Sequence, residues 1–293
     1  MKKLFSVLLV LVLVGSGRAQ IEDRFSFLTQ SEMENFSRPL ATALGSALNS
    51  GGYGSASIGT MFGFNFSVRA LLISIPDNQK EFTPTLPAGY TAKPTATIFG
   101  NEGSYYKGPN GYLIYPPGAN LKNLPFAFPQ ISASFMGAEV MLRMIPSIPI
   151  GDEKVNMFGV GARYDISNQL PMLPIDLAVG FMYNTFKVTN YIDNNNVAIS
   201  LLASYSPPAV GIITFYGGLQ YENSSMKLTY TYKDPNATTI GQQLQQKIEV
   251  DVKGDNSFRA TVGVGLSLGF VGVNVDYNIG KLSILTGGLS FGF

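Results

Sequence analysis

Charged side chains recur at alternate positions of several apolar segments, and these are the residues in this sequence best suited to chemistry. Alternate residues of a β-strand point to opposite sides, so this spacing places the charges on one common face. We expect that face to line an interior. It has two interpretations, a salt-bridge network that braces the interior or a selectivity lining for a polar solute. The residues are Arg69, Glu139, Arg143, Arg163, Asp165, Asp176, Lys187, Arg259 and Asp276.

The remaining inventory argues against an enzyme. The 293 residues contain neither histidine nor cysteine, so a Ser–His–Asp triad, a cysteine nucleophile and a Cys/His metal site are all excluded. The glycine-rich stretch 263–269 looks like a phosphate loop, but it lies within a predicted strand and no helix follows it. We therefore predict no catalytic site, cofactor or metal. The net charge of +1 also argues against a nucleic-acid partner.

The N-terminus predicts export. Lys2 and Lys3 precede an apolar run over 4–14, and a stretch with small residues follows this run and ends at Ala19. This is the pattern of a Sec-type signal peptide, 1–19, cleaved after Ala19. The alternative is a membrane anchor, but the run is shorter than the ~20 residues that a helical span needs. After residue 19 no apolar run reaches ~18 residues, so we expect no membrane-spanning helix in the mature chain.

Residues 30–48 carry a helical pattern, with apolar residues at steps of three and four. We expect Ser31 and Glu34 to form a capping box, and Pro39 to kink or split the helix. One interpretation is a surface helix packed on a core. The interpretation we favour is that 20–52 forms a plug or a periplasmic cap at a barrel mouth. Its plug or gate residues would be Met33, Phe36, Leu40, Leu44 and Leu48.

From residue 53 onward the pattern changes to strict alternation of apolar with small or polar residues. It predicts an all-β fold, a transmembrane antiparallel β-barrel of about 10–14 strands spanning 53–293. Residues 100–130 carry no strand that the pattern can place, and three interpretations stay open: a long loop, an inward plug or two further irregular strands. The predicted strands are 55–75, 92–99, 132–147, 154–166, 174–189, 197–206, 209–232, 247–268, 271–279 and 282–293.

A soluble, exported β-sandwich is the alternative to the barrel. Charged residues make up only 13% of the chain, against about 25% in ordinary soluble domains. The partners of the apolar rows are mainly Gly, Ser, Asn and Thr. In lipid every backbone group must be paired, so only a closed sheet is stable there. We therefore expect the last strand to pair with the first, which explains why the chain ends on the strand pattern of "LTGGLSFGF" at 285–293.

The connections predict the orientation. With both termini at the periplasmic side, 167–173, 206–209 and 269–272 become short periplasmic turns. The polar segments 190–196 and 233–247 then become outer loops. Short inner turns and longer outer loops are typical of outer-membrane barrels. We therefore expect the protein in the outer membrane of a Gram-negative cell, in contact with its lipid.

Three stretches carry a family resemblance: "ALGSALNSGGYGSASIGTMFGFNFSVRALLISIPD" (43–77), "FGVGARYDISNQLPMLPIDLAVGFMYNTF" (158–186) and the final "LSFGF". They resemble an uncharacterised family of Bacteroidetes-type outer-membrane barrels, which is similar to the FadL-like transporters of long-chain fatty acids and other hydrophobic compounds. The resemblance implies a monomeric barrel with an obstructed lumen that admits apolar molecules. The "NPA" stretch of those transporters has no clear counterpart here. The final Phe293 also resembles the signal read by the barrel-assembly machinery.

Three functions follow as hypotheses. The first is a FadL-like channel for small hydrophobic molecules, with 30–48 as its gate or plug. The second is a sealed structural or interaction barrel whose hairpin at 222–256 meets partners outside. The third is a general diffusion porin, which we rank last because charge in the lumen is sparse and the N-terminal segment is expected to obstruct it.

Overall fold

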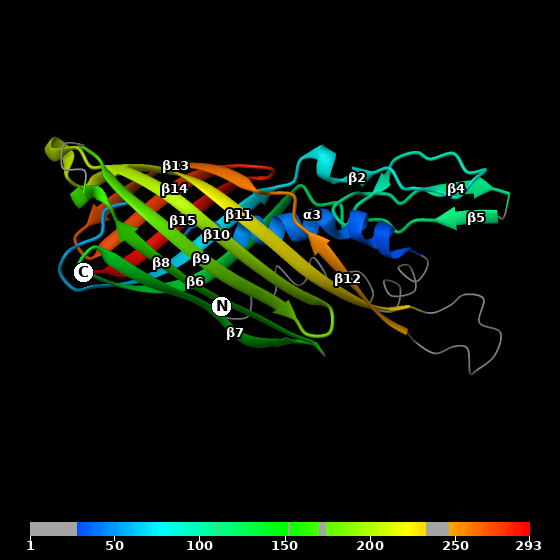
Figure 1. The fold of residues 1–293 in the computed structure, drawn as a ribbon, viewed down its shortest axis with the longest axis horizontal. Coiled ribbons are helices and arrows are strands. Elements are labelled where there is room, and N and C mark those ends of the chain that lie inside the picture. The colour runs from blue at the N-terminus through cyan, green and yellow to red at the C-terminus, as the bar shows by residue number, and fades with distance from the viewer. Residues whose placement is uncertain (1–27, 110, 152, 170–173, 233–245) are drawn as a thin grey trace.

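The computed structural model describes residues 28–109, 111–151, 153–169, 174–232 and 246–293. The predicted signal peptide and most of the segment 233–247 lie outside the described residues. Within them, ten antiparallel strands close into a barrel around one α-helix (Figure 1). The all-β barrel expected from the alternation is therefore confirmed, at the lower end of the expected strand number.

The wall is formed by consecutive neighbours, and it closes at two places. β10 pairs with β11, and β1 pairs with β15 from Asn65 opposite Gly292 to Ser74 opposite Ser283. The expected pairing of the last strand with the first is thus present. The wall strands are β1 (Gly63–Ser74), β6 (Asn123–Phe135), β7 (Ala138–Ile150), β8 (Glu153–Asp165), β9 (Asp176–Val188), β10 (Ile192–Tyr205), β11 (Ile213–Tyr232), β13 (Phe258–Leu268), β14 (Val271–Ile279) and β15 (Ser283–Gly292).

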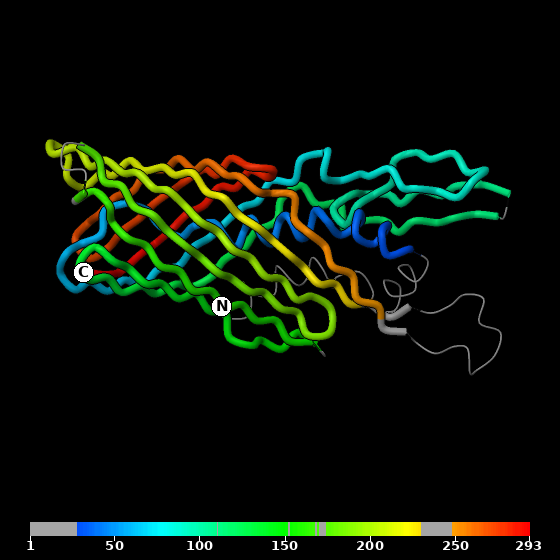
Figure 2. The backbone as a smooth tube through the Cα atoms, in the orientation of Figure 1, coloured from blue at the N-terminus to red at the C-terminus, as the bar shows by residue number. Residues whose placement is uncertain are grey.

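The strands run obliquely around the barrel (Figure 2). Their outward rows carry exposed apolar side chains, which form an apolar belt. The belt includes Phe64, Phe66, Val68, Leu142, Met144, Phe158, Val160, Val179, Phe181, Val197, Ile199, Phe215, Leu219, Val262, Val264, Val273, Val275, Leu285 and Leu289. Apolar rows facing outward and polar rows facing inward are the arrangement of a barrel in lipid. No described helix has the length and apolar character needed to cross a membrane.

The two ends of the barrel differ. We call the end that holds Gly63 and Phe293 the proximal end and the opposite one the distal end. The proximal connections include a tight turn at Gly269, whose φ is 67°, and the short helix η3 (Pro208–Val210). At the distal end, β10 already begins at Ile192, so the outer loop expected over 190–196 is instead a short turn with Asn190 at φ 68°.

The longest distal connection is the segment 75–122, which extends beyond the wall (Figure 1). It holds two small sheets, β2 (Glu81–Phe82) with β3 (Thr95–Ala96), and β4 (Tyr105–Gly108) with β5 (Gly111–Ile114). The strand expected over 92–99 is therefore only a two-residue piece outside the wall. The segment 100–130 contributes the β4–β5 hairpin and the start of β6.

The predicted strand 247–268 is two strands. β12 (Gln246–Lys253) pairs with the distal half of β11, and β13 then begins at Phe258 and pairs with the proximal half. The break lies at Gly254, where the backbone N–H donates to the carbonyl of Ser224 (3.0 Å). β11 is 20 residues long and extends beyond the apolar belt, so it can pair with β13 in its proximal half and with β12 in its distal half.

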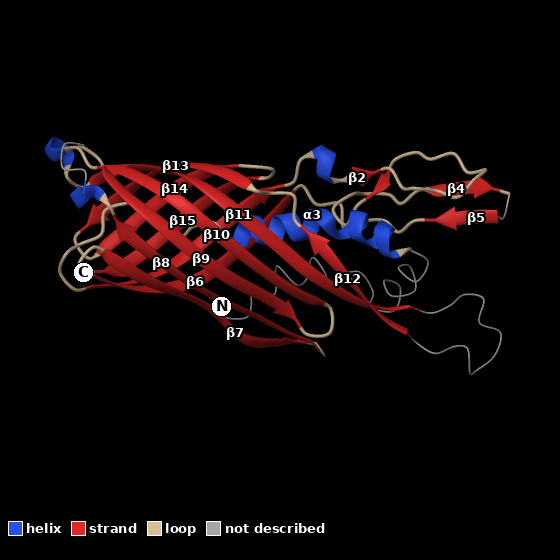
Figure 3. Cartoon of the chain, viewed as in Figure 1, coloured by secondary structure: helices blue, strands red, loops and turns tan. Residues whose placement is uncertain are grey.

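Helix α3 (Gln30–Leu48) lies along the barrel interior and contacts β1, β9, β10, β11 and β12 (Figure 3). Its five predicted plug residues are each no more than 2% exposed. The chain then continues through 49–62 to the proximal end, where β1 begins. The segment is therefore a plug inside the barrel and not a cap at the proximal mouth.

The local details of α3 differ from expectation. The capping box is formed by Thr29 and Glu32 rather than by Ser31 and Glu34. The helix remains continuous through Pro39. A proline inside a helix removes one backbone hydrogen bond, and here burial of every residue from 39 to 48 offsets that loss.

Candidate functional site

Two ion pairs join neighbouring strands on the inner face of the wall, one between β11 and β13 and one between β7 and β8. Arg259 lies 2.8 Å from Glu222, with both side chains almost fully buried, and Arg163 lies 2.8 Å from Glu139. Arg259, Arg163 and Glu139 are predicted lining residues, whereas Glu222 is not. Its inward position on the 20-residue strand β11 is readable from the alternation, but nothing in the sequence indicates that it would meet Arg259.

Arginines also hold the end of the plug. Arg143 donates from Nη1 to the carbonyl of Leu48 (2.7 Å), and Arg259 donates from Nη2 to the carbonyl of Ser46 (2.9 Å). The last carbonyls of a helix carry partial negative charge and have no partner within the helix. Two buried guanidinium groups therefore replace the water that would otherwise solvate this end of α3.

The remaining charges of the lumen are held by hydrogen bonds. Arg69 donates to the side-chain oxygen of Asn274, and Asp276 accepts from Tyr216 (2.9 Å). Asp165 accepts from the backbone N–H of Ile58 (3.3 Å), at the point where the plug segment nears the proximal mouth. Neither Arg69 nor Arg143 has a carboxylate within salt-bridge distance among the described residues. The two ion pairs are thus separate from each other, while hydrogen bonds extend them: Gln220 donates both to Glu222 (3.1 Å) and to the carbonyl of Asn49 (3.2 Å).

Two of the predicted lining residues need separate mention. Asp176 faces inward but is only partly buried, near the proximal mouth, where its carboxylate accepts from Ser204 (3.4 Å). Lys187 lies on the outer face of β9 and pairs with Asp193 at 2.8 Å. The expectation that Lys187 faces the lumen is therefore corrected: even-numbered residues of β9 point inward, and Lys187 has the opposite parity.

The proximal half of the lumen contains two cavities. A polar cavity of about 190 Å³ lies beside the plug segment, lined among others by Gly52, Arg69 and Gln130. A second, of about 260 Å³, lies at the proximal mouth beside Gly63 and Phe293. No group of three or more potential metal-ligating side chains occurs in the part of the chain that the structure describes. The proximal half is a polar seal around the residues that follow α3.

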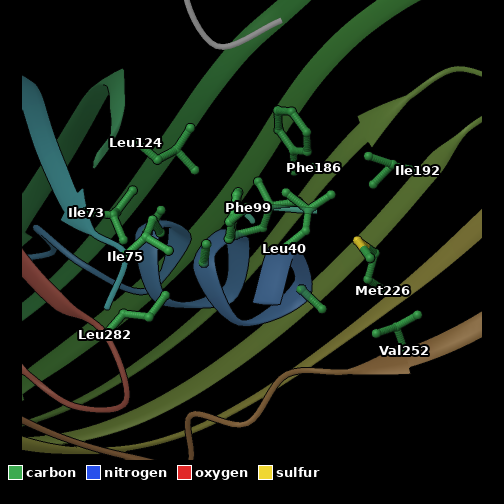
Figure 4. Packing of buried hydrophobic residues seen from close by; sticks show 14 of the residues in the cluster. Leu40, Ile73, Ile75, Phe99, Leu124, Phe186, Ile192, Met226, Val252 and Leu282 are labelled. Atoms are coloured by element: carbon green, nitrogen blue, oxygen red, sulfur yellow. The ribbon is translucent and has the colours of Figure 1, made fainter. Parts of the chain in front are cut away.

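The distal half is apolar. One continuous cluster of buried side chains surrounds α3 along most of its length and includes Leu40, Phe99, Leu124, Phe186 and Met226 (Figure 4). Arg143 stands at the boundary between the halves, because its guanidinium also lies 4.7 Å from the centre of the Phe128 ring. The interior is thus divided along its axis into an apolar distal chamber and a polar proximal seal.

A pocket of about 370 Å³ lies at the outer end of the apolar cluster, beside the N-terminus of α3. Leu28, Leu86, Leu113 and Tyr115 line it, and Glu32 is the one charged residue in its lining. Its size lies within the range of small-molecule pockets. We call it the distal pocket.

The segment 75–122 forms the outer wall of the distal pocket and is held by local contacts. The ring of Tyr106 packs edge-on against the ring of Tyr115, and the two ring centres are 5.4 Å apart. Burial raises the pKa of the Tyr106 hydroxyl, which donates to the carbonyl of Lys93 (2.8 Å). This wall is therefore ordered by buried aromatic residues and not only by its short strands.

The barrel wall is interrupted between β6 and β7. These strands pair from Phe135 opposite Ala138 to Gln130 opposite Arg143, and their described pairing ends there. β6 remains paired with β1 down to Asn123, and β7 remains paired with β8 down to Ile150. Residues 123–129 of β6 and 144–150 of β7 therefore form two facing unpaired edges, which we call the seam.

Prolines account for the seam. Pro125 and Pro129 lie on one edge, and Pro146 and Pro149 lie on the other. Continued past Arg143, the register would set Pro146 opposite Ala127. Proline has no backbone N–H and is confined to edge strands or bulges, and the β7–β8 pairing shifts register between Ile145 and Ile148. The prolines could have indicated this edge from the sequence.

The seam begins just inside the distal edge of the apolar belt, since Met144 belongs to both, and continues beyond it. On the neighbouring strands the outward row changes from Phe158 to Asn156 and from Tyr183 to Thr185 at this height. Unpaired backbone groups are very costly within hydrocarbon. Because most of the seam lies beyond the apolar belt, most of its unpaired groups avoid that cost. Side chains on both edges, including Phe126 and Ile145, belong to the same apolar cluster as the residues of the distal pocket.

The closed wall, the apolar belt and the polar lumen define this protein as a plugged outer-membrane β-barrel. The chain belongs to the family of unknown function DUF6588, whose model matches residues 1–293. No curated protein matches its sequence.

Solved structures that the chain is similar to are outer-membrane barrels. The translocator domain of the autotransporter NalP from Neisseria meningitidis aligns with 9% identity and a TM-score of 0.31, over 92% of this chain and 99% of that one. The OmpT loop-deletion mutant from Vibrio cholerae aligns with 12% identity and a TM-score of 0.28, over 79% and 98%. OmpF from Salmonella typhi aligns with 10% identity and a TM-score of 0.26, over 79% and 97%.

Proposed function

We propose that this barrel passes small hydrophobic molecules, as its resemblance to the FadL-like transporters implies, and that they move sideways through the seam. A molecule enters the distal pocket from outside, follows the apolar cluster along α3, and leaves between β6 and β7 at the level of the outer lipid leaflet. The protein is exported by residues 1–19 to the outer membrane of a Gram-negative cell, with its distal end outward.

The observation that carries this proposal is the break in strand pairing at the seam, beside the apolar cluster that also borders the distal pocket. Pocket residue Leu28 and seam residue Phe126 are members of one cluster, and Leu113 and Ile145 pack against it. A hydrophobic molecule on this path exchanges apolar contacts with the protein for apolar contacts with lipid. It therefore does not have to cross water or the polar seal. Exposing apolar surface to water costs about 25 cal/mol per Å², which is a large total for an alkyl chain.

A route straight along the barrel axis suits such molecules less well. It would lead past the buried Arg259–Glu222 pair and the residues after α3, where burying an alkyl chain would strip polar groups of their partners. α3 is accordingly proposed as a fixed plug that walls the route and not as the part that moves.

The remaining parts of the proposal concern partners. Phe293 ends the last strand and serves as the recognition signal for the barrel-assembly machinery. The protein works as a monomer without cofactor or catalytic activity, in contact with outer-membrane lipid through the apolar belt.

The seam can be tested by closing it. The chain has no cysteine, so the double variant Ala127→Cys/Pro146→Cys can be bridged specifically by a short bifunctional methanethiosulfonate reagent. We expect bridging to stop uptake of a fluorescent hydrophobic probe by cells or liposomes that contain the protein. Reduction should restore uptake, because it releases the two edges.

The matched control is Ile131→Cys/Leu142→Cys. These residues lie opposite each other on the same two strands, where the ladder is already closed, so the same bridge should leave uptake unchanged. Undiminished uptake after complete bridging at 127 and 146 would overturn the lateral route. Equal loss in both double variants would show that the reagent and not the seam is responsible.

A further inference from the structure

Glu32 places a carboxylate inside the apolar distal pocket. The residue is only 9% exposed, and no cation of the described residues lies within salt-bridge distance of it. Its Oε2 accepts from the backbone N–H of Thr29 (3.0 Å) and from the Thr29 hydroxyl (2.9 Å), and its Oε1 accepts from the hydroxyl of Tyr115. The carboxylate is thus held in one position at the pocket wall.

This arrangement has a chemical preference. An ionised carboxylate only accepts hydrogen bonds, so it favours a ligand head group that donates them. It repels another carboxylate, and the repulsion is stronger where apolar surroundings lower the local dielectric. The other lining side chains offer hydroxyl groups, at Thr29, Thr85 and Tyr115, and no positive charge.

We infer that the distal pocket selects apolar molecules with a neutral or cationic donor head group, such as a hydroxyl or an ammonium, and rejects fatty-acid carboxylates. This inference rests on the proposed function and specifies its substrate class. The apolar part of the ligand contacts Leu28, Leu86 and Leu113, and the head group donates to Glu32 Oε1 in place of, or beside, the Tyr115 hydroxyl.

The test uses the purified full-length protein and the neutral dye N-phenyl-1-naphthylamine, displaced by 1-decanol, decylamine or decanoate at neutral pH. We expect decanol and decylamine to displace the dye at concentrations about tenfold lower than decanoate does, a factor that corresponds to about 1.4 kcal/mol. Glu32→Gln should remove most of this difference by improving displacement by decanoate. Glutamine still supports a capping box, so the helix start is retained.

Glu34→Gln is the matched control. Glu34 lies two residues along the same helix, pairs with Arg38 at 2.9 Å and does not line the pocket, so its removal should leave the order of displacement unchanged. Heat-modifiable electrophoretic mobility confirms that each variant is folded, and if Glu32→Gln fails that check, Tyr115→Phe, which frees Oε1, should widen the preference for donor head groups.

The possible failures differ. If decanoate displaces the dye as well as decanol does, while bridging of the seam still stops uptake, the head-group inference is overturned and the proposed function stands. Equal shifts in Glu32→Gln and Glu34→Gln would also overturn the inference, since they would reflect total charge. If the dye does not bind at all, both fail.

Discussion

At the scale of single residues, the lumen shows how a membrane barrel buries charge. Arg259 contacts Glu222, the carbonyl of Ser46 and the hydroxyl of Ser50, so its guanidinium is shared between the wall and the plug. A buried ion pair gains little over an apolar replacement of the same shape, but loss of one partner is costly. The pair therefore serves mainly to fix the position of the end of α3.

If Arg259 and Glu222 are a coupled buried pair, a double-mutant cycle has a definite expected outcome. Arg259→Met should lower the free energy of unfolding by about 3–5 kcal/mol, because it leaves Glu222 buried and unpaired. Adding Glu222→Leu should recover much of that loss. Urea titrations in lipid vesicles, followed by tyrosine fluorescence or circular dichroism, measure both. Additive losses in the double variant would contradict a coupled pair.

At the scale of elements, the fit between α3 and the wall depends on close approach. A Cβ placed on Gly45 would collide with the side chain of Ser224 on β11, and Ser224 itself donates to the carbonyl of Ala41 (3.0 Å). Glycine at this position lets the helix backbone lie directly against the strand. The helical pattern of 30–48 indicates an amphipathic helix, but it does not show which glycine meets which strand.

We therefore expect Gly45→Ala to destabilise the protein by about 1–3 kcal/mol, the usual cost of overpacking. Ser224→Gly removes the colliding atoms, so the double variant should be more stable than Gly45→Ala alone despite losing the Ser224 hydrogen bond. The midpoint of thermal or urea unfolding in detergent measures this. If Ser224→Gly and Gly45→Ala are simply additive, the helix and strand do not meet as described.

At the scale of the whole molecule, the division of the lumen into an apolar chamber and a polar seal separates the three functional hypotheses. A porin needs an open axis, whereas the proposed lateral route needs the seal to remain closed. Asn184 donates to the side-chain oxygen of Asn49 (3.1 Å), so the residue after α3 lies within cross-linking reach of β9.

A tether between plug and wall tests this difference. Asn49→Cys/Asn184→Cys can be bridged by the same short bifunctional methanethiosulfonate reagent, because the tips of the two native side chains meet in a hydrogen bond. We expect the bridged protein to take up the hydrophobic probe as the reduced protein does, and both to show no steady ion conductance in planar bilayers. Uptake that requires reduction would instead identify movement of the plug as the gate.

Much of this architecture follows from local pattern. Alternation in twos, scarce charge and an apolar final strand require a closed sheet, because lipid offers the backbone no hydrogen-bonding partners. The same alternation placed Arg69, Arg143, Arg259 and Asp276 on the inner face, where they lie. The prediction was wrong for Lys187, because this odd-numbered residue of β9 lies on the outer face.

What the sequence by itself determined is therefore the direction in which each side chain points, since that depends only on strand and helix periodicity. Which inward residues meet was decided by tertiary structure alone: the Arg259–Glu222 pair joins strands through a register that no local pattern specifies, and Glu32 enters the distal pocket only because residues 75–122 fold over α3. The seam lies between the two cases. Its prolines are visible in the chain, but that they face one another across neighbouring strands depends on closure of the whole barrel.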